Sequence, residues 1–341
     1  MKTVIIDESK KSEWEQYIYD NPNSVPGQSY EWSSLLRRHY SFDFYPIAAV
    51  EDTKICGILP LYHLTTASGK DVLISAPYAV NGGILADNEQ AAQVLFEKAK
   101  EISKKHNGCP ITLKQYKIRI AGDMRIDDSY YNRQLNVARN SSDIWKEISE
   151  QNRHNIEETM KHELVLEYPS RDVNGFYKLL LRYHHKKGVP CVNQKWIEDL
   201  IEYRMSSIAI LRSNNHIVAA TMVKDFRDWF SFPFTCVPDT TDKATLFAYG
   251  LYWQLILRFT TEGKRIFHSG RIPNTDQTDI YRLGWGGTRY DYCYHYYPNT
   301  TVKTDFTRKR GWKRDLFEKL WRMVPEPVAG ALGPSIVKRF P

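Results

Sequence analysis

The chain has 341 residues, of which 42% are hydrophobic and 26% charged, and its formal net charge is +7. This length allows two domains, and the composition is that of a globular protein rather than a disordered chain. Five cysteines without any CxxC pair argue against a disulfide framework and a structural zinc site. The N-terminal apolar run is only three residues, Val4 to Ile6, and no segment approaches the roughly 20 apolar residues that cross a bilayer. We therefore expect a cytoplasmic protein with no signal peptide, no metal site and no tightly bound cofactor.

The chain repeats one order of predicted elements, which indicates an internal duplication. The clearest repeat is a hairpin, in which two β-rich runs join through polar turn residues at 46–59 and again at 207–221. A strand and two helices precede each hairpin, and a long helix, a glycine and a further strand follow it. These elements fall at 3–6, around 14–18, 30–36, 89–106 and 110–113 in the first copy, and at 164–167, around 176–180, 195–201, 244–261 and 265–267 in the second.

Each copy therefore predicts an α/β (α+β) domain, with helices against a mixed central sheet that ends in an aromatic-rich strand. We place the first domain at residues 1–140 and the second at 141–303, beginning with one charged helix from Ser141 to Met160. Residues 304–341 form a basic tail. From Thr301 to Pro341 there are ten Lys and Arg against four Asp and Glu, so +6 of the net +7 lies there.

The stretch from Lys264 to Tyr297 carries the strongest functional signal. A short strand reaches Gly270-Arg271, a polar loop follows, and Tyr281-Arg282 precede Leu283-Gly284-Trp285-Gly286. Glycine permits a bend or a close ligand approach at a strand end, and arginines hold phosphate or carboxylate groups. A β-meander with solvated arginines and a core Trp285 would give the same local pattern.

Taken together, these pieces resemble the Fem-type aminoacyltransferases, which have two tandem GNAT-like (acyl-CoA N-acyltransferase) domains. They are closer still to the Fem-like proteins of exopolysaccharide and exosortase gene neighbourhoods. The matching pieces, which span most of the chain, are Gly57–Leu61, Ser75–Tyr78 with Gly82-Gly83, Lys187–Pro190, Leu251–Trp253, Gly270-Arg271, Tyr281-Arg282 with Trp285-Gly286, and Leu332–Pro334. The resemblance implies transfer of an aminoacyl or acyl group to an amine, forming an amide on a nucleotide-sugar or lipid-linked amino-sugar precursor of the cell envelope or an exopolysaccharide.

Two donors follow from the resemblance, aminoacyl-tRNA and acyl-CoA. The chain has no R/Q-x-x-G-x-G/A loop of the kind that cradles the pyrophosphate of acetyl-CoA, and this favours aminoacyl-tRNA as the co-substrate. The chain departs from the family pattern where His268 or Ser269 replaces the usual Asp, where Arg282 replaces the usual Lys, and at Glu157 and Glu158 in a helix that is usually basic. These differences put the usual acceptor in question and leave a non-catalytic adaptor of polysaccharide assembly as an alternative.

Two residues are candidates for catalysis. His268 is a candidate general base, because an unperturbed imidazole has a pKa of about 6.5 and suits proton removal from an ammonium group, and Tyr281 is a candidate donor to a tetrahedral intermediate. A structural histidine and a core tyrosine are the simpler interpretations of the same residues. Acyl transfer by orientation and oxyanion stabilisation needs no covalent nucleophile, and we find no arrangement that indicates one.

Seven residues are candidates for binding substrates or anions. Gly270, Arg271 and Arg282 belong to the signature stretch, and surface ion pairs are the alternative role of the two arginines. Tyr78 and Asn81, next to Gly82-Gly83, are predicted either to line a cleft between the domains or to form a plain turn. Arg37 and Arg153 lie on predicted helices, where they either bind the acceptor phosphate or face solvent.

The tail from Phe306 to Val324 is predicted to be a basic amphipathic helix, with Trp312, Leu316, Leu320 and Trp321 on one side. Such a helix suits peripheral contact with an anionic membrane, at its inner face for a cytoplasmic protein. It would equally cover the sheet of the first domain, or contact tRNA phosphates.

Overall fold

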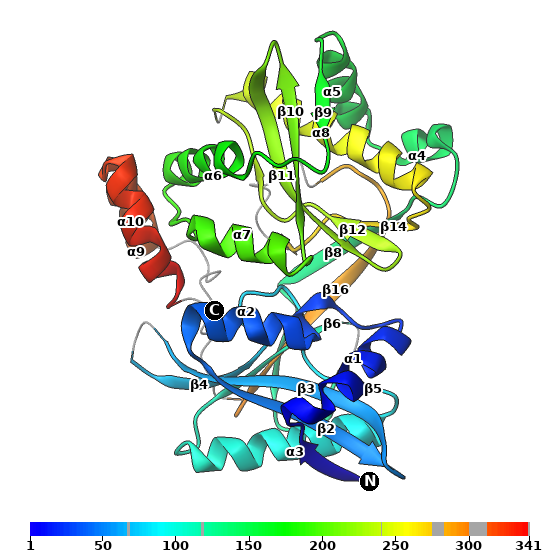
Figure 1. Ribbon diagram of the computed structural model, residues 1–341, viewed down its shortest axis with the longest axis vertical. Helices are drawn as coiled ribbons and strands as arrows, with labels where there is room; N and C mark the ends of the chain where they lie inside the picture. The colour runs from blue at the N-terminus through cyan, green and yellow to red at the C-terminus, as the bar shows by residue number, and fades with distance from the viewer. Residues whose placement is uncertain (67–68, 117–118, 240, 275–282, 300–311, 340–341) are drawn as a thin grey trace. The chain divides into compact units, whose positions relative to one another are not determined.

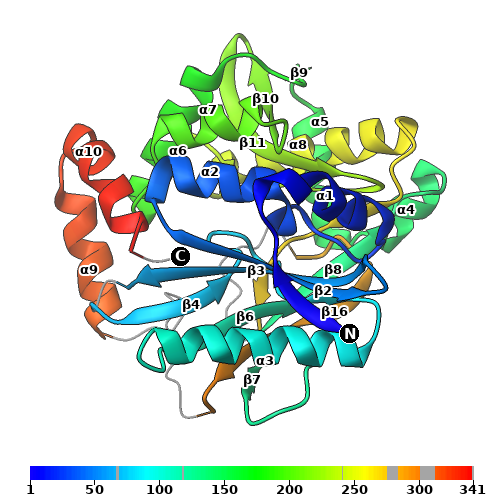
Figure 2. The same ribbon diagram turned by 60° about the horizontal axis from the view of Figure 1, so that its bottom comes forward.

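The computed structural model describes residues 1–66, 69–116, 119–239, 241–274, 283–299 and 312–339 (Figures 1 and 2). The chain divides into two compact units, each assembled from separate stretches of sequence. Unit 1 comprises Met1–Tyr130, Asp291–Arg308 and Lys338–Pro341, and unit 2 comprises Tyr131–Tyr290 and Lys309–Val337.

Unit 1 contains a mixed sheet in the order β1-β2-β3-β4-β6-β16. Its neighbouring strands pair antiparallel except β4 and β6, which are parallel. Residues 43–65 form the predicted first hairpin, with the turn at Asp52 and Thr53, both of which have positive φ. The strands are β1 (Lys2–Ile5), β2 (Asp43–Glu51), β3 (Lys54–Thr65), β4 (Asp71–Ser75), β6 (Ile111–Tyr116) and β16 (Thr288–Tyr297), with β5 (Leu85–Ala86) beside β3 and β7 (Arg125–Asp127) beside β16.

Helices cover both faces of the unit 1 sheet. α1 (Lys11–Asp20) and α2 (Tyr30–Tyr40) lie on one face and α3 (Glu89–Lys105) on the other (Figure 2). α3 begins where Asn88 Oδ1 accepts a hydrogen bond from the Ala91 N–H (2.8 Å). Its apolar stripe then packs on the sheet, with Leu95 and Phe96 in a core that includes Ile111. Short 3-10 turns at Glu8–Lys10 and Pro26–Gln28 precede α1 and α2.

Unit 2 repeats this plan, with a sheet in the order β9-β10-β11-β12-β14-β8. Again one neighbouring pair, β12 and β14, is parallel, while the other pairs are antiparallel. The predicted second hairpin is β10 and β11. The strands are β8 (Tyr130–Asn136), β9 (Val165–Glu167), β10 (Ser207–Ser213), β11 (His216–Phe226), β12 (Trp229–Ser231) and β14 (Ile266–His268), with β13 (Thr235–Cys236) beside β11 and β15 (Ile272–Pro273) beside β8.

α8 (Asp242–Thr261) packs on one face of this sheet, where the ring of Phe259 stacks on Phe230 at 4.4 Å. α6 (Val173–Lys187) and α7 (Gln194–Glu202) lie on the other face (Figure 1). α9 (Trp312–Met323) and α10 (Glu326–Val337) pack against α6, whereas the sequence also allowed the sheet of the first domain as the support of the tail helix. Trp285 is 1% exposed beneath α8, which confirms its core interpretation.

The charged segment 141–160 is two helices, α4 (Ser141–Glu147) and α5 (Glu150–Met160), and the prediction of a single helix was wrong. The chain breaks at Ile148 and Ser149 because both residues are extended, and the Ser149 hydroxyl accepts from the Asn152 N–H to cap α5. The Ser149 N–H, which a continuous helix would use, instead donates to the carbonyl of Gly284 (2.7 Å).

The two halves of the chain exchange their last strands. The aromatic strand β16 comes from the second half but pairs with β6 in unit 1, and β8 comes from the first half but pairs with β14 in unit 2. Each copy does end in a strand, β8 in the first and β16 in the second, but each of these strands pairs with a strand of the other half, which was not predicted. The predicted domains 1–140 and 141–303 are contiguous, whereas each of the two units includes a strand from the other half. Over the described part of the chain, no helix is both long enough and apolar enough to cross a membrane.

Candidate functional site

The end of β14 is fixed by hydrogen bonds to β8 within unit 2. The Ser269 N–H donates to the Arg133 carbonyl (3.0 Å), and the Arg133 N–H donates to the Ser269 hydroxyl (3.0 Å). The N–H of Gly270, at φ +83°, donates to Asn132 Oδ1 (3.2 Å). Asn132 is 1% exposed, and its Nδ2 has no hydrogen-bond partner among the described residues. The strand end that precedes Arg271 is thus held in one geometry.

A cavity of about 400 Å³ opens in unit 2 just after Arg271. Its wall at Leu283 and Gly284 is tied to the start of α5, because the Asn152 amide donates to the Leu283 carbonyl (2.7 Å). Only glycine fits at 284, since φ is +76° and a Cβ there would clash with Ser149 Oγ. The described lining residues are Tyr131, Arg133, Glu147, Ser149, Ile272, Pro273, Asn274, Leu283, Gly284 and Gly286.

Cationic side chains border this cavity. Arg133 donates through Nη1 to the Gly287 carbonyl (2.9 Å), and Arg289 lies over the Tyr131 ring at 4.2 Å while it donates to Asn274 Oδ1 (2.8 Å). The one acidic residue among the described lining residues, Glu147, is paired with Arg139 at 2.6 Å. Arginine forks that are already positioned favour an anionic ligand group.

A row of polar side chains crosses the face of the unit 2 sheet that is turned away from α8. Lys224 on β11 pairs with Ser231 on β12, Ser231 with His268 on β14, and His268 with Gln134 on β8. Residues paired in register point to the same face, and neighbouring strands lie about 4.8 Å apart. The next row, Phe230 and Phe267, faces α8, so the four residues of this polar row face away from α8.

The polar row is half-buried, which keeps its groups ordered but reachable. The His268 ring stacks on Trp229, with centroids 4.6 Å apart and planes 3° from parallel. Burial of the Lys224 ammonium lowers the pKa of that side chain to about 8. A lysine with this pKa, on the same face as an imidazole, is the kind of group that can deprotonate an amine nucleophile.

Among the sequence candidates, unit 2 holds His268, Gly270, Arg271 and Arg153. His268 lies in the polar row, and Arg271 directly precedes two residues that line the cavity. Arg153 is on α5, where its guanidinium donates to the Ile148 carbonyl. Tyr281 and Arg282 lie outside the described residues.

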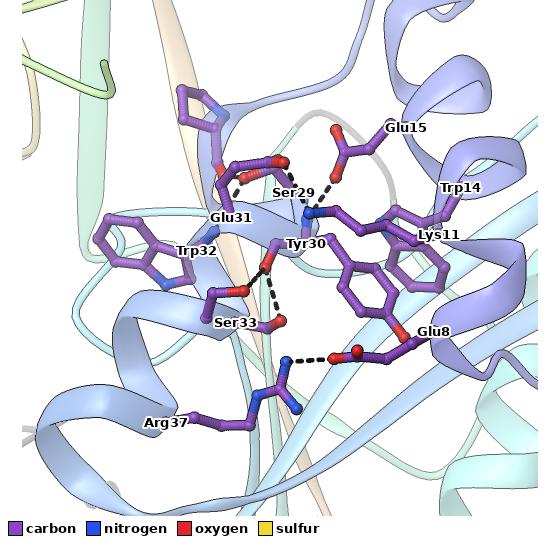
Figure 3. A network of polar contacts seen from close by, with 12 residues as sticks. Glu8, Lys11, Trp14, Glu15, Ser29, Tyr30, Glu31, Trp32, Ser33 and Arg37 are labelled. Atoms are coloured by element: carbon purple, nitrogen blue, oxygen red, sulfur yellow. Dashed lines mark hydrogen bonds and ion pairs between the residues drawn. The ribbon is translucent and has the colours of Figure 1, made fainter. Parts of the chain in front are cut away.

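Arg37, Tyr78 and Asn81 belong to unit 1. Arg37, on α2, pairs with Glu8 at 3.0 Å (Figure 3). Tyr78 has a positive φ of 61°, stacks on Tyr40 at 4.5 Å and donates its hydroxyl proton to the Lys338 carbonyl (2.7 Å). Asn81 is half-buried in the loop after β4. Roles for these three residues in substrate binding stay predictions.

The sequence did not single out Lys224, Ser231, Gln134 or Asn132. Their only local signal is a polar residue at the end of a β-rich run, which many surface strands share. What brings Gln134 next to His268 is the strand exchange, and no local pattern reports it. Among the described residues, no group of three or more His, Cys, Asp or Glu side chains is arranged to hold a metal ion.

Comparison with known proteins gives likeness in structure alone. No protein-family model matches the sequence, and no curated protein matches it. The solved structure of FemX aligns with a TM-score of 0.67 at 10% identity, covering 86% of this chain and 97% of that one. The C-terminal domain of a putative lysylphosphatidylglycerol synthetase from Agrobacterium fabrum gives 0.56 at 8%, covering 85% and 92%. A tandem GNAT protein from the clavulanic acid biosynthesis pathway gives 0.54 at 12%, covering 89% and 99%. The predicted fold, FemAB-like with two tandem GNAT-like domains, is confirmed.

Proposed function

We propose that this FemAB-like tandem GNAT protein transfers an acyl or aminoacyl group to an amine, with the chemistry in unit 2. The observation that carries the proposal is the polar row beside the end of β14, where Lys224 and His268 face the same side of the sheet. A fold shared with FemX supports the reaction class, and the half-buried proton acceptors support an amine as the nucleophile.

In the proposed reaction, His268 accepts a proton from the ammonium group of the acceptor, and the free amine attacks the acyl carbon. The tetrahedral intermediate collapses with cleavage of the bond to the donor, an ester C–O bond in aminoacyl-tRNA or a thioester C–S bond in acyl-CoA. The nitrogen loses two protons in all: the one taken up by His268 passes to solvent, and the other leaves with the departing hydroxyl or thiol. Tyr281 is proposed to donate to the oxyanion, which needs donors fixed in advance.

Arg271 is proposed to hold an anionic group of a substrate, with Arg282 and Arg153 as further cations. The position of Arg271 before Ile272 and Pro273, which line the cavity, supports this role. Gly270 would let the backbone approach the ligand, since its φ is +83°. Arg37, Tyr78 and Asn81 remain proposed acceptor contacts of unit 1.

For the donor we propose aminoacyl-tRNA, and for the acceptor an amino sugar of a cell-envelope or exopolysaccharide precursor, nucleotide- or lipid-linked. Likeness to a domain named as a putative lysylphosphatidylglycerol synthetase supports an aminoacyl donor. An acyl-CoA donor is the second candidate, because the solved structure of the clavulanic acid protein is described as the form without AcCoA. A non-catalytic adaptor is the third.

The test is transfer of a radiolabelled acyl group from charged tRNA or from acyl-CoA to UDP-linked amino sugars, with melting temperatures measured for each ligand. We expect transfer that RNase abolishes and that His268→Asn lowers about a hundredfold or more. His216→Asn, an exposed histidine at the start of β11, is the control and should retain full activity.

Each other outcome selects against part of the proposal. RNase-resistant transfer from acyl-CoA would replace the donor. Full activity of His268→Asn would remove the proton-acceptor role. No transfer and no thermal shift with any donor or acceptor would favour the third candidate, the non-catalytic adaptor.

A further inference from the structure

Exposed apolar side chains gather on the hairpin of α9 and α10. Of the twelve large hydrophobic residues that are exposed in the described part of the chain, six belong to this hairpin. Their exposure runs from 45% for Val328 to 74% for Met323. They are Trp312, Leu316, Leu320 and Met323 on α9 and Val328 and Leu332 on α10. A concentration of this kind on a globular unit marks a surface that binds something.

α9 has a packed side and a separate exposed apolar side. Trp321, which is 6% exposed, and Phe317, stacked on it at 5.7 Å, belong to the side that packs in unit 2. The carbonyl of Glu318 lies so close to Gly188, at the end of α6, that a Cβ there would approach it to 2.5 Å. The packed side therefore rests on α6, and the sequence-based placement of Trp321 on the same side as Leu316 was wrong.

The exposed residues of α9 follow the spacing of one helical face. Trp312, Leu316, Leu320 and Met323 are separated by four, four and three residues, so at 3.6 residues per turn they form a single stripe. The stripe lies on the side of the helix away from Trp321. Packing on α6 leaves this stripe uncovered in unit 2.

α10 continues the same arrangement with small residues. Its packed side carries Ala329, 1% exposed, and Gly333, where a Cβ would lie 2.9 Å from the Cys191 carbonyl. Val328 and Leu332 point outward, and the segment from Pro327 to Val337 contains no charged residue. Small residues thus hold α10 close to unit 2 while its larger apolar side chains face out.

Basic side chains accompany the apolar stripe. Lys319 and Arg322 are exposed on α9, and the helix continues a tail with ten basic and four acidic residues between Thr301 and Pro341. Glu318 is already neutralised by Arg314 (2.8 Å) and Arg322 (3.6 Å), so it adds little repulsion toward an anion. Apolar and aromatic side chains between lysines and arginines are the pattern of a helix that lies in a lipid interface.

We propose that the α9–α10 hairpin docks the protein on the surface of an anionic lipid bilayer. Trp312, Leu316, Leu320 and Met323 enter the interface, and the basic side chains contact the lipid phosphates. α6 carries the hairpin, so docking would tether unit 2 to the surface. The charge of the tail selects an anionic bilayer over a neutral one.

The test is flotation of the full chain with vesicles of phosphatidylcholine containing about 30% phosphatidylglycerol, compared with pure phosphatidylcholine. We expect binding to the anionic vesicles alone and release at about 0.5 M NaCl, because salt screens the phosphate contacts. The double variant Leu316→Gln/Leu320→Gln should lower the bound fraction roughly tenfold or more. Its melting temperature should stay within about 2 °C of wild type, since surface substitutions change stability little.

Met323→Gln and Met160→Gln form a matched pair, because both methionines are exposed in unit 2, at 74% and 58%, and only Met323 belongs to the hairpin. Weaker binding by Met323→Gln alone supports the proposal. Equal binding of the two variants, equal binding to neutral vesicles, or no binding would overturn it. So would a wild-type dimer that Leu316→Gln/Leu320→Gln converts to monomer, because the stripe would then join two copies of the chain. None of these readouts depends on transferase activity.

Discussion

Units 1 and 2 share one plan but treat the ends of their parallel strands differently. In unit 1 the loop after β4 folds onto β6. The Lys114 N–H donates to the Ser75 hydroxyl (2.8 Å), the Lys114 carbonyl accepts from the N–H groups of Gly82 and Gly83 (both 3.1 Å), and Lys114 Nζ donates to the Ala79 carbonyl (3.2 Å). Lys114 is 8% exposed. Buried polar groups need such partners, so the hydrogen bonds at this end of unit 1 serve the stability of the loop.

The corresponding end of unit 2 is organised around side chains. Ser231 and His268, at the ends of β12 and β14, are half-buried and share a face with Lys224. A duplicated element has thus become a packed loop in one copy and a reachable polar row in the other. This contrast is our reason for placing the proposed chemistry in unit 2, and substitutions that affect stability in one unit and activity in the other would test it.

The largest expected effect is on the packed loop of unit 1. Gly82 has φ +143°, and a Cβ there would lie 2.5 Å from the Ala76 Cβ and 3.3 Å from the Gly27 backbone. Gly82→Ala should therefore lower the free energy of unfolding by about 3 kcal/mol, through backbone strain and a clash that no side-chain rotation relieves. Urea denaturation of the two proteins measures this difference.

Gly108→Ala is the matched control in the same unit. Its φ of +68° is also unfavourable for alanine, but no atom lies within 4 Å of the added Cβ. We expect a loss of about 1 kcal/mol from conformation alone. If the two variants lost equal free energies of unfolding, the loop around Gly82 would be able to shift away from the added Cβ. It would then not be the rigid, packed loop that we contrast with the polar row of unit 2.

In unit 2, Lys224→Met should affect activity and stability in opposite directions. Loss of the amine lowers the proposed transfer about a hundredfold. Because burial lowers the pKa of Lys224 to about 8, the folded protein binds this proton less tightly than the unfolded chain. The charged lysine therefore lowers the free energy of unfolding by its full amount below pH 8, and this loss of stability disappears as pH rises toward the ordinary lysine value of about 10.5. At pH 7 the variant should be more stable by about 1–2 kcal/mol, allowing for partial exposure of the side chain.

Lys264→Met is the control for this prediction. Lys264 contacts Asp225 at 2.5 Å and donates to the Arg227 carbonyl (2.7 Å), so its removal breaks an ion pair and a hydrogen bond. Its removal should destabilise unit 2 by up to about 1 kcal/mol and leave catalysis unchanged. Thermal melts between pH 7 and 10 distinguish the two lysines. A Lys224→Met protein less stable than wild type at pH 7 would contradict the buried-charge argument.

The hairpins and long helices were predictable because their signals are local. Polar turns between β-rich runs marked 46–59 and 207–221, and apolar spacing marked α3 and α8. Ser149 also carried a local capping signal, but a charged, weakly periodic segment was interpreted as one helix. The polar row was not predictable, because its members come from distant parts of the chain and only strand register aligns them. His268 was found through a motif, whereas Lys224 and Gln134 needed the structure.

The smallest predicted effect concerns a half-buried carboxyl pair in unit 1, Glu15 on α1 and Glu31 on α2 (Figure 3). Burial, with Glu31 beside it, raises the pKa of Glu15 to about 7, although the Tyr30 N–H donates to Glu15 Oε1 (2.5 Å). Burial also disfavours the charge of Glu31, but hydrogen bonds from its own N–H, from Lys11 and from Glu15 hold the pKa of Glu31 below its ordinary value. Glu15 is thus the member of the pair that keeps a proton.

Glu15→Gln tests whether the polar groups of unit 1 affect stability rather than activity. A raised carboxyl pKa means that the folded state holds a proton that the unfolded chain releases, so stability falls as pH rises from about 4.5 to about 7 and stays lower above that. The glutamine keeps the uncharged form, so the stability of the variant should no longer fall with pH, and its free energy of unfolding should be about 1 kcal/mol higher at pH 8, with transfer activity unchanged.

Glu13→Gln is the control, because Glu13 is an exposed glutamate on the same helix, and it should keep the pH dependence of wild type. Urea midpoints at pH 5 and pH 8 measure both variants. If the stability of Glu15→Gln changed with pH as much as that of wild type, Glu15 would not be the cause of the pH dependence. Together with Lys224→Met, the pair would assign the pH dependence between about 4.5 and 7 to unit 1 and that above pH 8 to unit 2.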